Sequence, residues 1–379
     1  MTAWGGEQVE QAVAECVAAL RPGTGRDWAA VRAGRLEWDC LKVAEHIAGD
    51  LIGYAGQLAG RVADRYAPYD IGLDDGTDAE GALAVIATTG ALLAAAVRTA
   101  SRDARGFHPF PFRSADREGF AAMGIVEVLV HTHDIAEGLG LPFTPPGPLV
   151  EDVLARIFPH VRPGEAPWPT LLWATGRGEL PGREPLTRWH WYNNPALPAE
   201  RITLHGVTPA AARDLAAGGD GGFDWVADGP YEGTRDAAGM VVKAYEAGVL
   251  RPEWGMFVEV RHDDGLAVGG IGFHGAPEDG RVEIGYDLAP SARGQGYATE
   301  ALRTLSGRAL AHDDVQVVIA VIDDDNKPSQ GVVTRAGFTR ATTDEERTAR
   351  EQRGMSGAQQ LYVRRGQAGV RAAPPAPYR

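Results

Sequence analysis

The sequence predicts two domains of different fold class, an all-α four-helix bundle followed by an α/β domain with a mixed sheet. Two observations support this prediction. Four long segments with apolar residues at helical spacing precede residue 140, whereas strand-like and helix-like segments alternate from Arg201 to Arg365. A chain of 379 residues is long enough for two such domains, each with its own core.

The bundle is predicted from the helical segments Gly6 to Leu20, Asp39 to Asp64, Asp78 to Arg102 and Ala115 to Gly138. Asp39 and Ser114 are candidate N-caps, because short polar side chains accept hydrogen bonds from the first helical N–H groups. Gly138 and Gly140 are candidate helix ends. The apolar run from Ala82 to Val97 is too short to span a bilayer, and so we expect it to lie in the bundle core.

Residues 141–200 are rich in Pro, Gly and Trp and separate the two regular patterns. Within this stretch we expect short helices at Leu149 to Phe158 and Leu171 to Thr175, followed by a strand at Arg188 to Tyr192. We assign the stretch to the first domain. The linker is then expected near Asn194 to Glu200.

The second domain is predicted to begin at Arg201, where strands and helices start to follow one another. The expected strands are Arg201–Val207, Gly255–Arg261, Leu266–His274, Arg281–Leu288, Val315–Asp323 and Gln359–Arg364. The expected helices begin at Thr208, at Thr234, after Gly296 and at Asn326. The predicted domains are therefore 1–196 and 201–365, and the composition of residues 366–379 indicates a disordered tail.

Residues 281–305 are the stretch most informative about chemistry. An alternating strand ends at Pro290, and the turn Arg293-Gly-Gln-Gly-Tyr-Ala298 then leads directly into a helix. Glycines let the backbone approach a ligand closely, and a helix N-terminus favours an anion. We therefore expect a ligand that carries phosphate. Such turns are common without a ligand, however, and so the motif alone is a weak signal.

The flanking residues strengthen this interpretation. The stretch resembles the acetyl-CoA-binding motif of the GNAT superfamily of N-acetyltransferases, Arg/Gln-x-x-Gly-x-Gly/Ala, with Arg293, Gly296 and Ala298 at its positions. The resemblance extends over residues 201–365. It implies a GNAT acyl-CoA N-acyltransferase fold, acetyl-CoA as the cofactor, and the amine of a small molecule or a peptide N-terminus as the acceptor.

The resemblance also implies roles for single residues. Those expected to bind CoA are Leu288, Arg293, Gly294, Gln295, Gly296, Tyr297, Ala298, Asn326 and Ser329. Glu283 matches a position that often acts as general base through water, and a solvated strand carboxylate is the alternative. Many members carry a Tyr that protonates the leaving thiolate where this chain has Val333. Because of that departure, three alternatives are open. Tyr362 or water protonates the thiolate, CoA leaves as the thiolate, or the domain binds acyl-CoA without turnover.

The fourth predicted helix contains a candidate metal site. Glu127 and His131 are four residues apart on one face, which Asp134 shares, whereas His133 lies on another face. His46 lies among apolar residues of the second helix, where a neutral ring needs a partner. Two His and one carboxylate can hold a divalent ion and leave positions open. Glu/His pairs at this spacing are frequent on ordinary helices, and so a core histidine beside a helix-surface pair is the competing explanation.

This half resembles the mycothiol-dependent maleylpyruvate isomerase family within the DinB-like bundles, on the segments LEWDCLKVAEHIAGDL and VHTHDIAEGLG. The resemblance places His46, Glu127 and His131 at metal-binding positions. It implies a divalent metal, zinc in that family, and a low-molecular-weight thiol as partner.

Composition limits the possible partners and the compartment. Lys+Arg 37 against Asp+Glu 51 gives a formal net charge of −14, which disfavours nucleic acid and acidic membrane surfaces. Two cysteines, Cys16 and Cys40, cannot form a disulfide framework, and the N-terminus has no signal-peptide pattern. We therefore expect a cytoplasmic protein.

Our hypothesis is an N-acetyltransferase fused to a metal-binding, thiol-transferase-like domain. One alternative is a metal-dependent, mycothiol-dependent isomerase or thiol S-transferase with an accessory acyl-CoA-binding domain. Another is a non-catalytic sensor of acetyl-CoA and metal. Assays of acetyl transfer with and without chelator would separate the three.

Overall fold

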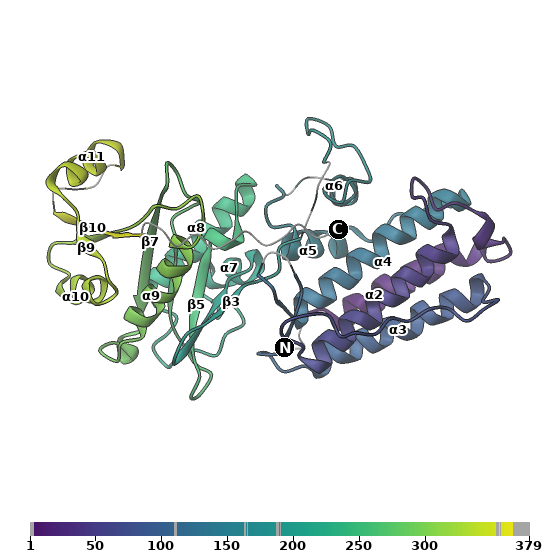
Figure 1. Cartoon of the computed structure of the whole chain (residues 1–379), viewed down its shortest axis with the longest axis horizontal. Helices are drawn as coiled ribbons and strands as arrows, with labels where there is room; N and C mark the ends of the chain where they lie inside the picture. Colours follow the sequence, from purple (N-terminus) through teal and green to yellow (C-terminus); the bar gives the residue numbers. More distant parts are fainter. Residues whose placement is uncertain are drawn as a thin grey trace. The chain divides into compact units, whose positions relative to one another are not determined.

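The computed structural model describes residues 4–366 except 110–111, 163, 165, 187–188, 190, 354–355 and 357. It divides into two compact units, Met1–Asn194 and Pro195–Arg379, each with its own hydrophobic core (Figure 1). All of the predicted disordered tail except Gly366 lies outside the described residues.

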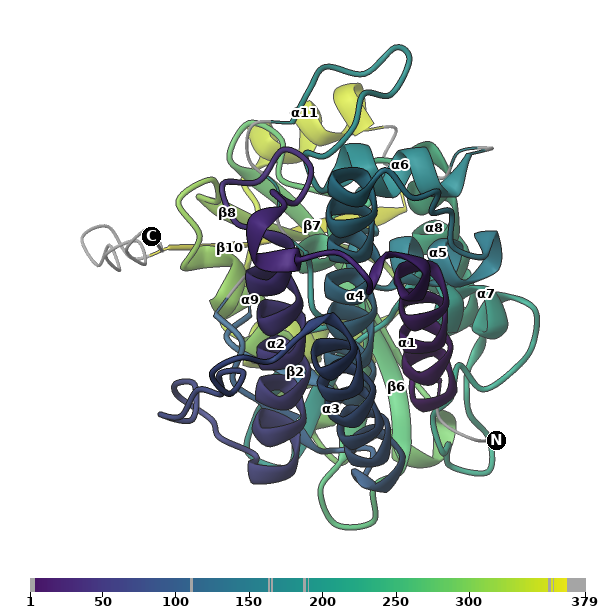
Figure 2. The same cartoon turned by 90° about the vertical axis from the view of Figure 1, so that its right-hand side faces the viewer.

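The first unit is a bundle of four long helices, α1 (Gly6–Leu20), α2 (Cys40–Gly60), α3 (Ala79–Thr99) and α4 (Arg117–Leu139). They lie side by side in Figures 1 and 2. Asp39 caps α2 as predicted, with its carboxylate accepting from the Lys42 N–H at 2.8 Å. The Ser114 prediction is wrong, because Asp116 caps α4 and accepts from the Gly119 N–H at 2.7 Å.

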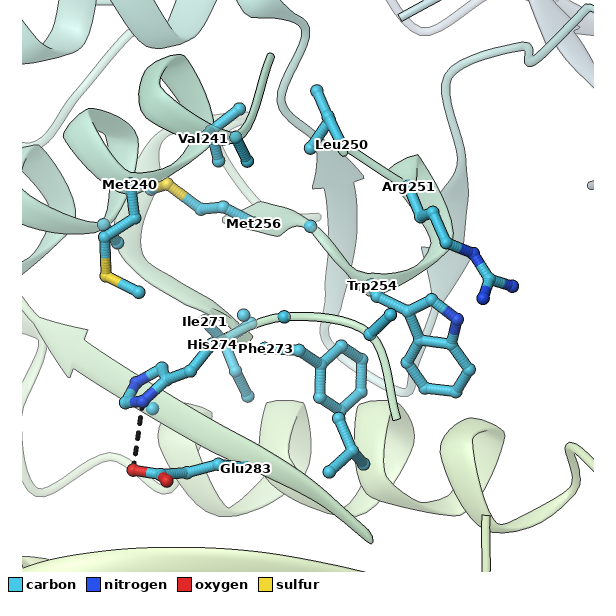
Figure 3. Close-up of a pocket in the computed structure, with 18 of the residues that line it drawn as sticks. Met240, Val241, Leu250, Arg251, Trp254, Met256, Ile271, Phe273, His274 and Glu283 are labelled. Atoms are coloured by element: carbon cyan, nitrogen blue, oxygen red, sulfur yellow. Dashed lines mark ion pairs between the residues drawn. The ribbon is translucent and has the colours of Figure 1, made fainter. Parts of the chain in front are cut away.

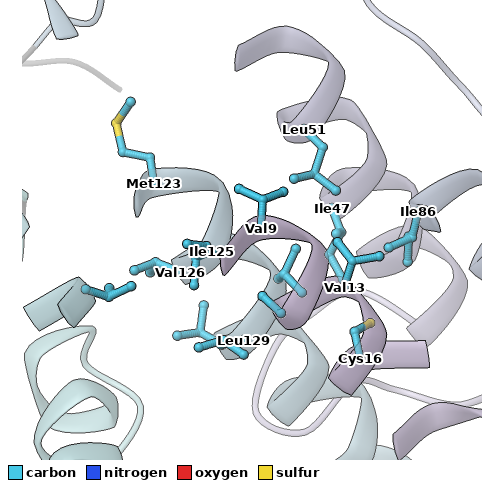
Figure 4. Close-up of a cluster of buried hydrophobic side chains, with 14 of the residues drawn as sticks. Val9, Val13, Cys16, Ile47, Leu51, Ile86, Met123, Ile125, Val126 and Leu129 are labelled. Carbon is cyan, nitrogen blue, oxygen red and sulfur yellow. The ribbon is translucent and has the colours of Figure 1, made fainter. Parts of the chain in front are cut away.

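Apolar residues from all four helices form the bundle core (Figure 4). By length and composition, α3 is the one helix in the described residues that could cross a membrane. Its Leu83, Ile86, Leu93 and Val97 are nevertheless buried against the other helices. The structure therefore explains the apolar character of α3 by burial within the protein.

The rest of the first unit includes α5 (Gly147–Ile157), α6 (Pro167–Ala174) and a two-stranded ribbon of β1 (Arg105–Gly106) and β2 (Ala115–Asp116). The strand predicted at Arg188–Tyr192 is not formed by Trp189, Trp191 and Tyr192, and its other two residues lie outside the described ones. The Tyr192 N–H donates to the Ile157 carbonyl, so this segment packs on α5 instead.

The second unit contains an eight-stranded sheet in the order β3-β4-β5-β6-β7-β8-β10-β9. The strands are β3 (Ala196–Pro198), β4 (Ile202–Gly206), β5 (Met256–Arg261), β6 (Ala267–Phe273), β7 (Arg281–Leu288), β8 (Val317–Asp323), β9 (Thr339–Arg340) and β10 (Gln359–Arg365). Among the strand pairs of the described residues, β7–β8 is the parallel one, which confirms a mixed sheet. The predicted linker is partly wrong, because it contains β3, a short edge strand paired with β4.

Helices cover both faces of this sheet. They are α7 (Pro209–Ala216), α8 (Glu232–Ala247), α9 (Tyr297–Leu310), α10 (Lys327–Arg335) and α11 (Thr343–Arg353). Successive side chains of a strand point to opposite faces. Asp287 bonds Thr234 at the start of α8, and the neighbouring Tyr286 bonds Ser329 of α10. We therefore place α8 on one face and α10 on the other.

Candidate functional site

The parallel pairing of β7 with β8 ends early. It joins Arg281, Val282 and Glu283 to Val317, Val318 and Ile319, although β7 continues to Leu288. The Glu283 carbonyl accepts from the N–H of His274, just after β6, and the Ala289 N–H donates to Val268 of β6, which fixes the alternation along β7. The N–H groups of Tyr286 and Leu288 therefore point towards β8, and neither has a hydrogen-bond partner in the described part of the chain. These two donors are available to a ligand.

The glycine turn follows at the end of β7. Gly294 and Gly296 have φ of 77° and 92°, in the left-handed region that favours glycine. Gly296 is the N-cap of α9, and no side chain caps this helix. The first N–H groups of α9 are thus left for an external acceptor, which suits an anion. The predicted residues Gly294 to Ala298 therefore lie together in one turn at this helix end.

Arg201, at the edge of β4, holds this turn and was missed by the sequence reasoning. Its Nη1 donates to the Gln295 carbonyl at 2.9 Å, and its Nε donates to the Glu300 carboxylate at 2.9 Å. The guanidinium of Arg293 donates to the Leu288 carbonyl at 3.1 Å and lies 4.9 Å from the Tyr231 ring centroid. Two cations therefore flank the uncapped helix end, which favours phosphate further.

The predicted residues of α10 lie next to β7. Asn326 caps the helix, since its side-chain oxygen accepts from the Ser329 N–H at 3.2 Å. The Ser329 carbonyl accepts from the Tyr286 hydroxyl at 3.2 Å, which ties α10 to β7 beyond the end of the parallel ladder. Val333 is fully buried, and the Tyr362 hydroxyl donates to Gln360 at 3.0 Å.

A cavity of about 840 Å³ lies on the α8 face of β5, β6 and β7. The residues that line it are mostly apolar and include Met240, Val241, Leu250, Trp254, Met256, Ile271 and Phe273 (Figure 3). The side chains of Ile271 and Phe273 point to the opposite face, because these residues pair with Ile284 and Tyr286 of β7. Its charged lining residues are Asp236, Arg251, Glu278, Arg281, Glu283 and Asp287. The cavity and the unpaired amides thus lie along the same strand, β7.

Asp287 is a fixed part of this cavity. Its carboxylate accepts from the Thr234 hydroxyl at 2.6 Å, the Thr234 N–H at 3.0 Å and the Gly270 N–H at 3.3 Å. Burial raises the pKa of Asp287 above its ordinary value, and these hydrogen bonds only partly offset the effect. The side chain therefore ties β7 to α8 and has little freedom to act on a substrate.

Glu283 has a different environment. Its Oε1 lies 3.0 Å from Nδ1 of His274, which immediately follows β6 (Figure 3). The sequence reasoning missed His274. The available signal was the hairpin itself, because the two predicted strands place residue 274 opposite residue 283.

In the first unit, the structure brings the three predicted metal ligands together. One potential ligand atom from each of His46, Glu127 and His131 lies within 4.8 Å of the others. Nε2 of His131 is 3.2 Å from the Glu127 carboxylate, and Nε2 of His46 is 3.9 Å from it. His46 also lies 3.2 Å from Asp50.

A buried carboxylate fixes the orientation of His131. Its Nδ1 lies 2.9 Å from Asp134, which in turn accepts from Nε of Arg177 at 3.0 Å. If Nδ1 carries the proton donated to Asp134, Nε2 faces Glu127, as in carboxylate–histidine–metal arrangements. Burial opposes the charged ring, but Asp134 and Glu127 raise the pKa of His131 to about 9. The donor set therefore fits a divalent ion, which would have to replace a proton on His131.

Comparison with known proteins identifies an acetyltransferase domain in the second unit. Residues 201–339 match the family model of an acetyltransferase (GNAT) domain. Over 83 residues the chain is 37% identical to the uncharacterised N-acetyltransferase YjdG of Bacillus subtilis (strain 168), a match that covers 22% of this chain and 49% of that protein. The chain thus spans about half the length of this relative.

Solved acetyltransferase structures align with a little under half of the chain. The acetyltransferase of Agrobacterium tumefaciens str. C58 aligns over 48% of this chain and 99% of its own, at 22% identity and a TM-score of 0.32. The GNAT-family acetyltransferase of Bacillus anthracis aligns over 45% and 98%, at 17% identity and a TM-score of 0.31.

Proposed function

We propose that this chain, whose C-terminal unit is a GNAT acetyltransferase domain, transfers the acetyl group of acetyl-CoA to an amine held in the cavity beside α8. The observation that carries the proposal is the arrangement along β7. The amides of Tyr286 and Leu288 and the uncapped start of α9 follow the parallel ladder. The cavity, with the Glu283 carboxylate on its wall, lies on the α8 face of the same strand.

Each part has a role in this proposal. The turn from Arg293 to Ala298 holds the pyrophosphate, and Asn326 and Ser329 border the CoA arm. The Leu288 N–H is placed to polarise the thioester carbonyl, because it points away from β6 and has no partner in the described chain. Glu283, on the cavity wall, serves the removal of the amine proton. We assign protonation of the leaving thiolate to solvent, because Val333 carries no hydroxyl.

The cavity also indicates the chemistry of the acceptor. Its apolar walls suit a substrate with an apolar body, and its four carboxylates favour a cationic amino group. We propose a primary amine of this kind, either a small molecule or a peptide N-terminus with an apolar first residue. Cys16 and Cys40 are buried free thiols, which supports our placing the activity in the cytoplasm.

A thiol-release assay tests this function. Wild-type protein with acetyl-CoA should release CoA faster with 2-phenylethylamine, or with a peptide that begins with Met, than with spermidine or glutamate. Met240 lines the cavity and is partly exposed, so Met240→Asn should lower kcat/KM for the aromatic amine but not for a very small amine. Equal rates with all four acceptors would contradict the proposed substrate class, and CoA release that never exceeds hydrolysis would contradict the transfer.

We propose a second function for the bundle, supported by the cluster of His46, Glu127 and His131. These side chains would hold a divalent ion of the zinc type, with Asp134 orienting His131. The bound ion would lower the pKa of a low-molecular-weight thiol at an open position. Metal analysis of the purified full-length protein tests this, and an empty site after growth in metal-replete medium, with no binding on titration, would contradict it.

A further inference from the structure

At the cavity, the imidazole of His274 is more exposed than the carboxylate of Glu283. The His274 side chain is 47% exposed, whereas that of Glu283 is 19% exposed and lies behind it at 3.0 Å. A substrate that enters the cavity would therefore meet the ring before the carboxylate. The cavity lining includes both residues (Figure 3).

Gly285 makes room for this ring. A Cβ built on Gly285 would lie 2.8 Å from Nε2 of His274, so any side chain there would displace the imidazole. The ring thus spans one step along the cavity face of β7, with Nδ1 at Glu283 and Nε2 above Gly285. Nε2 thus lies past Glu283, which is the last residue of β7 in the parallel ladder.

We propose that His274 is the catalytic residue that accepts the proton of the acceptor amine at Nε2, and that Glu283 orients the ring by accepting from Nδ1–H. This inference rests on the proposed acetyl transfer. The amine nitrogen forms a bond to the thioester carbonyl carbon, and the C–S bond breaks with its electron pair on sulfur. The N–H proton moves to Nε2, and the imidazolium then releases it to the thiolate or to water.

Charged groups line the cavity around the His274 ring. The charged groups that line the cavity are Asp236 and Arg251, Glu278 and Arg281, and Glu283 and Asp287. Four of these six are acidic. The Glu283 carboxylate lies 3.0 Å from Nδ1 of His274. It would therefore contact the imidazolium that forms during the transfer.

Substitution of His274, with pH–rate profiles, tests the assignment. With acetyl-CoA and the preferred amine, His274→Ala should lower kcat by about 10²- to 10⁴-fold without weakening acetyl-CoA binding. Added imidazole should restore part of the rate. His274→Asn keeps a donor towards Glu283 but has no basic nitrogen, and it should be as slow as His274→Ala. His262→Ala removes an exposed imidazole from the same unit and is the matched control.

Glu283→Gln provides the contrast, because it leaves the basic nitrogen in place. It should retain the acid limb of the kcat/KM profile, and His274→Ala should lose that limb. Wild-type rates in the His274 variants at every pH would overturn the assignment and leave Glu283 acting through water. A wild-type protein that binds acetyl-CoA but acetylates no amine would overturn the proposed function, and this assignment with it.

Discussion

Glu259 of β5 offers a test of burial in the C-terminal unit. The side chain is fully buried, and neither carboxylate oxygen has a hydrogen-bond partner in the described part of the chain. Burial, and then the nearby Asp287 and Glu300 carboxylates, raise the pKa of Glu259 well above its ordinary 4.5. The folded unit therefore holds this proton more tightly than the unfolded chain does.

The sign of the pH dependence follows from that difference. Below the pKa of Glu259 in the unfolded chain, the carboxyl is protonated in both states. Burying it then destabilises the folded unit least, because the buried group is neutral. As the pH rises towards the folded pKa, only the unfolded chain loses its proton, and the free energy of unfolding falls. One linked proton gives a slope of at most about 1.4 kcal/mol per pH unit. Glu259→Gln cannot ionise and should remove this slope.

Calorimetry of the full-length protein would measure the effect. The transition of the C-terminal unit is the one that moves on addition of acetyl-CoA. From about pH 5 to 8, the stability of Glu259→Gln relative to wild type should rise with pH. Glu259→Leu, which also removes the unpaired polar group, should show the same trend, and Glu246→Gln on the exposed face of α8 should show none. A Glu259→Gln difference that stays constant with pH would refute the reasoning.

Three further predictions concern binding, turnover and metal. Acetyl-CoA should bind wild type with a Kd on the order of 1 μM to 1 mM in calorimetry. Gly296→Glu should abolish this binding, because a Cβ there would lie 3.2 Å from Arg201 and the added negative charge would repel phosphate. Glu283→Gln should lower kcat by up to about 10²- to 10⁴-fold while acetyl-CoA affinity is kept; a kcat equal to that of wild type would return Glu283 to a structural role. Purified protein should carry about one divalent ion, which His131→Ala loses and His133→Ala keeps, and chelation should destabilise the first unit alone.

The sequence could predict the elements whose patterns are local. β7 has the predicted bounds, because its alternation is regular and Pro290 follows it. β3 was missed because three residues are too few to show a period. α11 was missed because its sequence, TDEERTAREQR, is charged throughout and has no apolar stripe.

The same distinction applies to the site. The glycine turn could be found because its conformation and the helix end after it are encoded in adjacent residues. His274 and Arg201 could not be found in this way. His274 contacts Glu283 only through the hairpin register, and Arg201 contacts Gln295 of the turn from 94 residues away in sequence.

The early end of the β7–β8 ladder should be visible in the exchange of single amide protons. The Gly285 and Asp287 amides face β6 and should exchange slowly with solvent deuterium, whereas those of Tyr286 and Leu288, which face the diverging β8, should exchange quickly. Fast and slow sites would thus alternate residue by residue within one strand. Acetyl-CoA that occupies this edge should slow the two fast sites and leave the two slow ones unchanged.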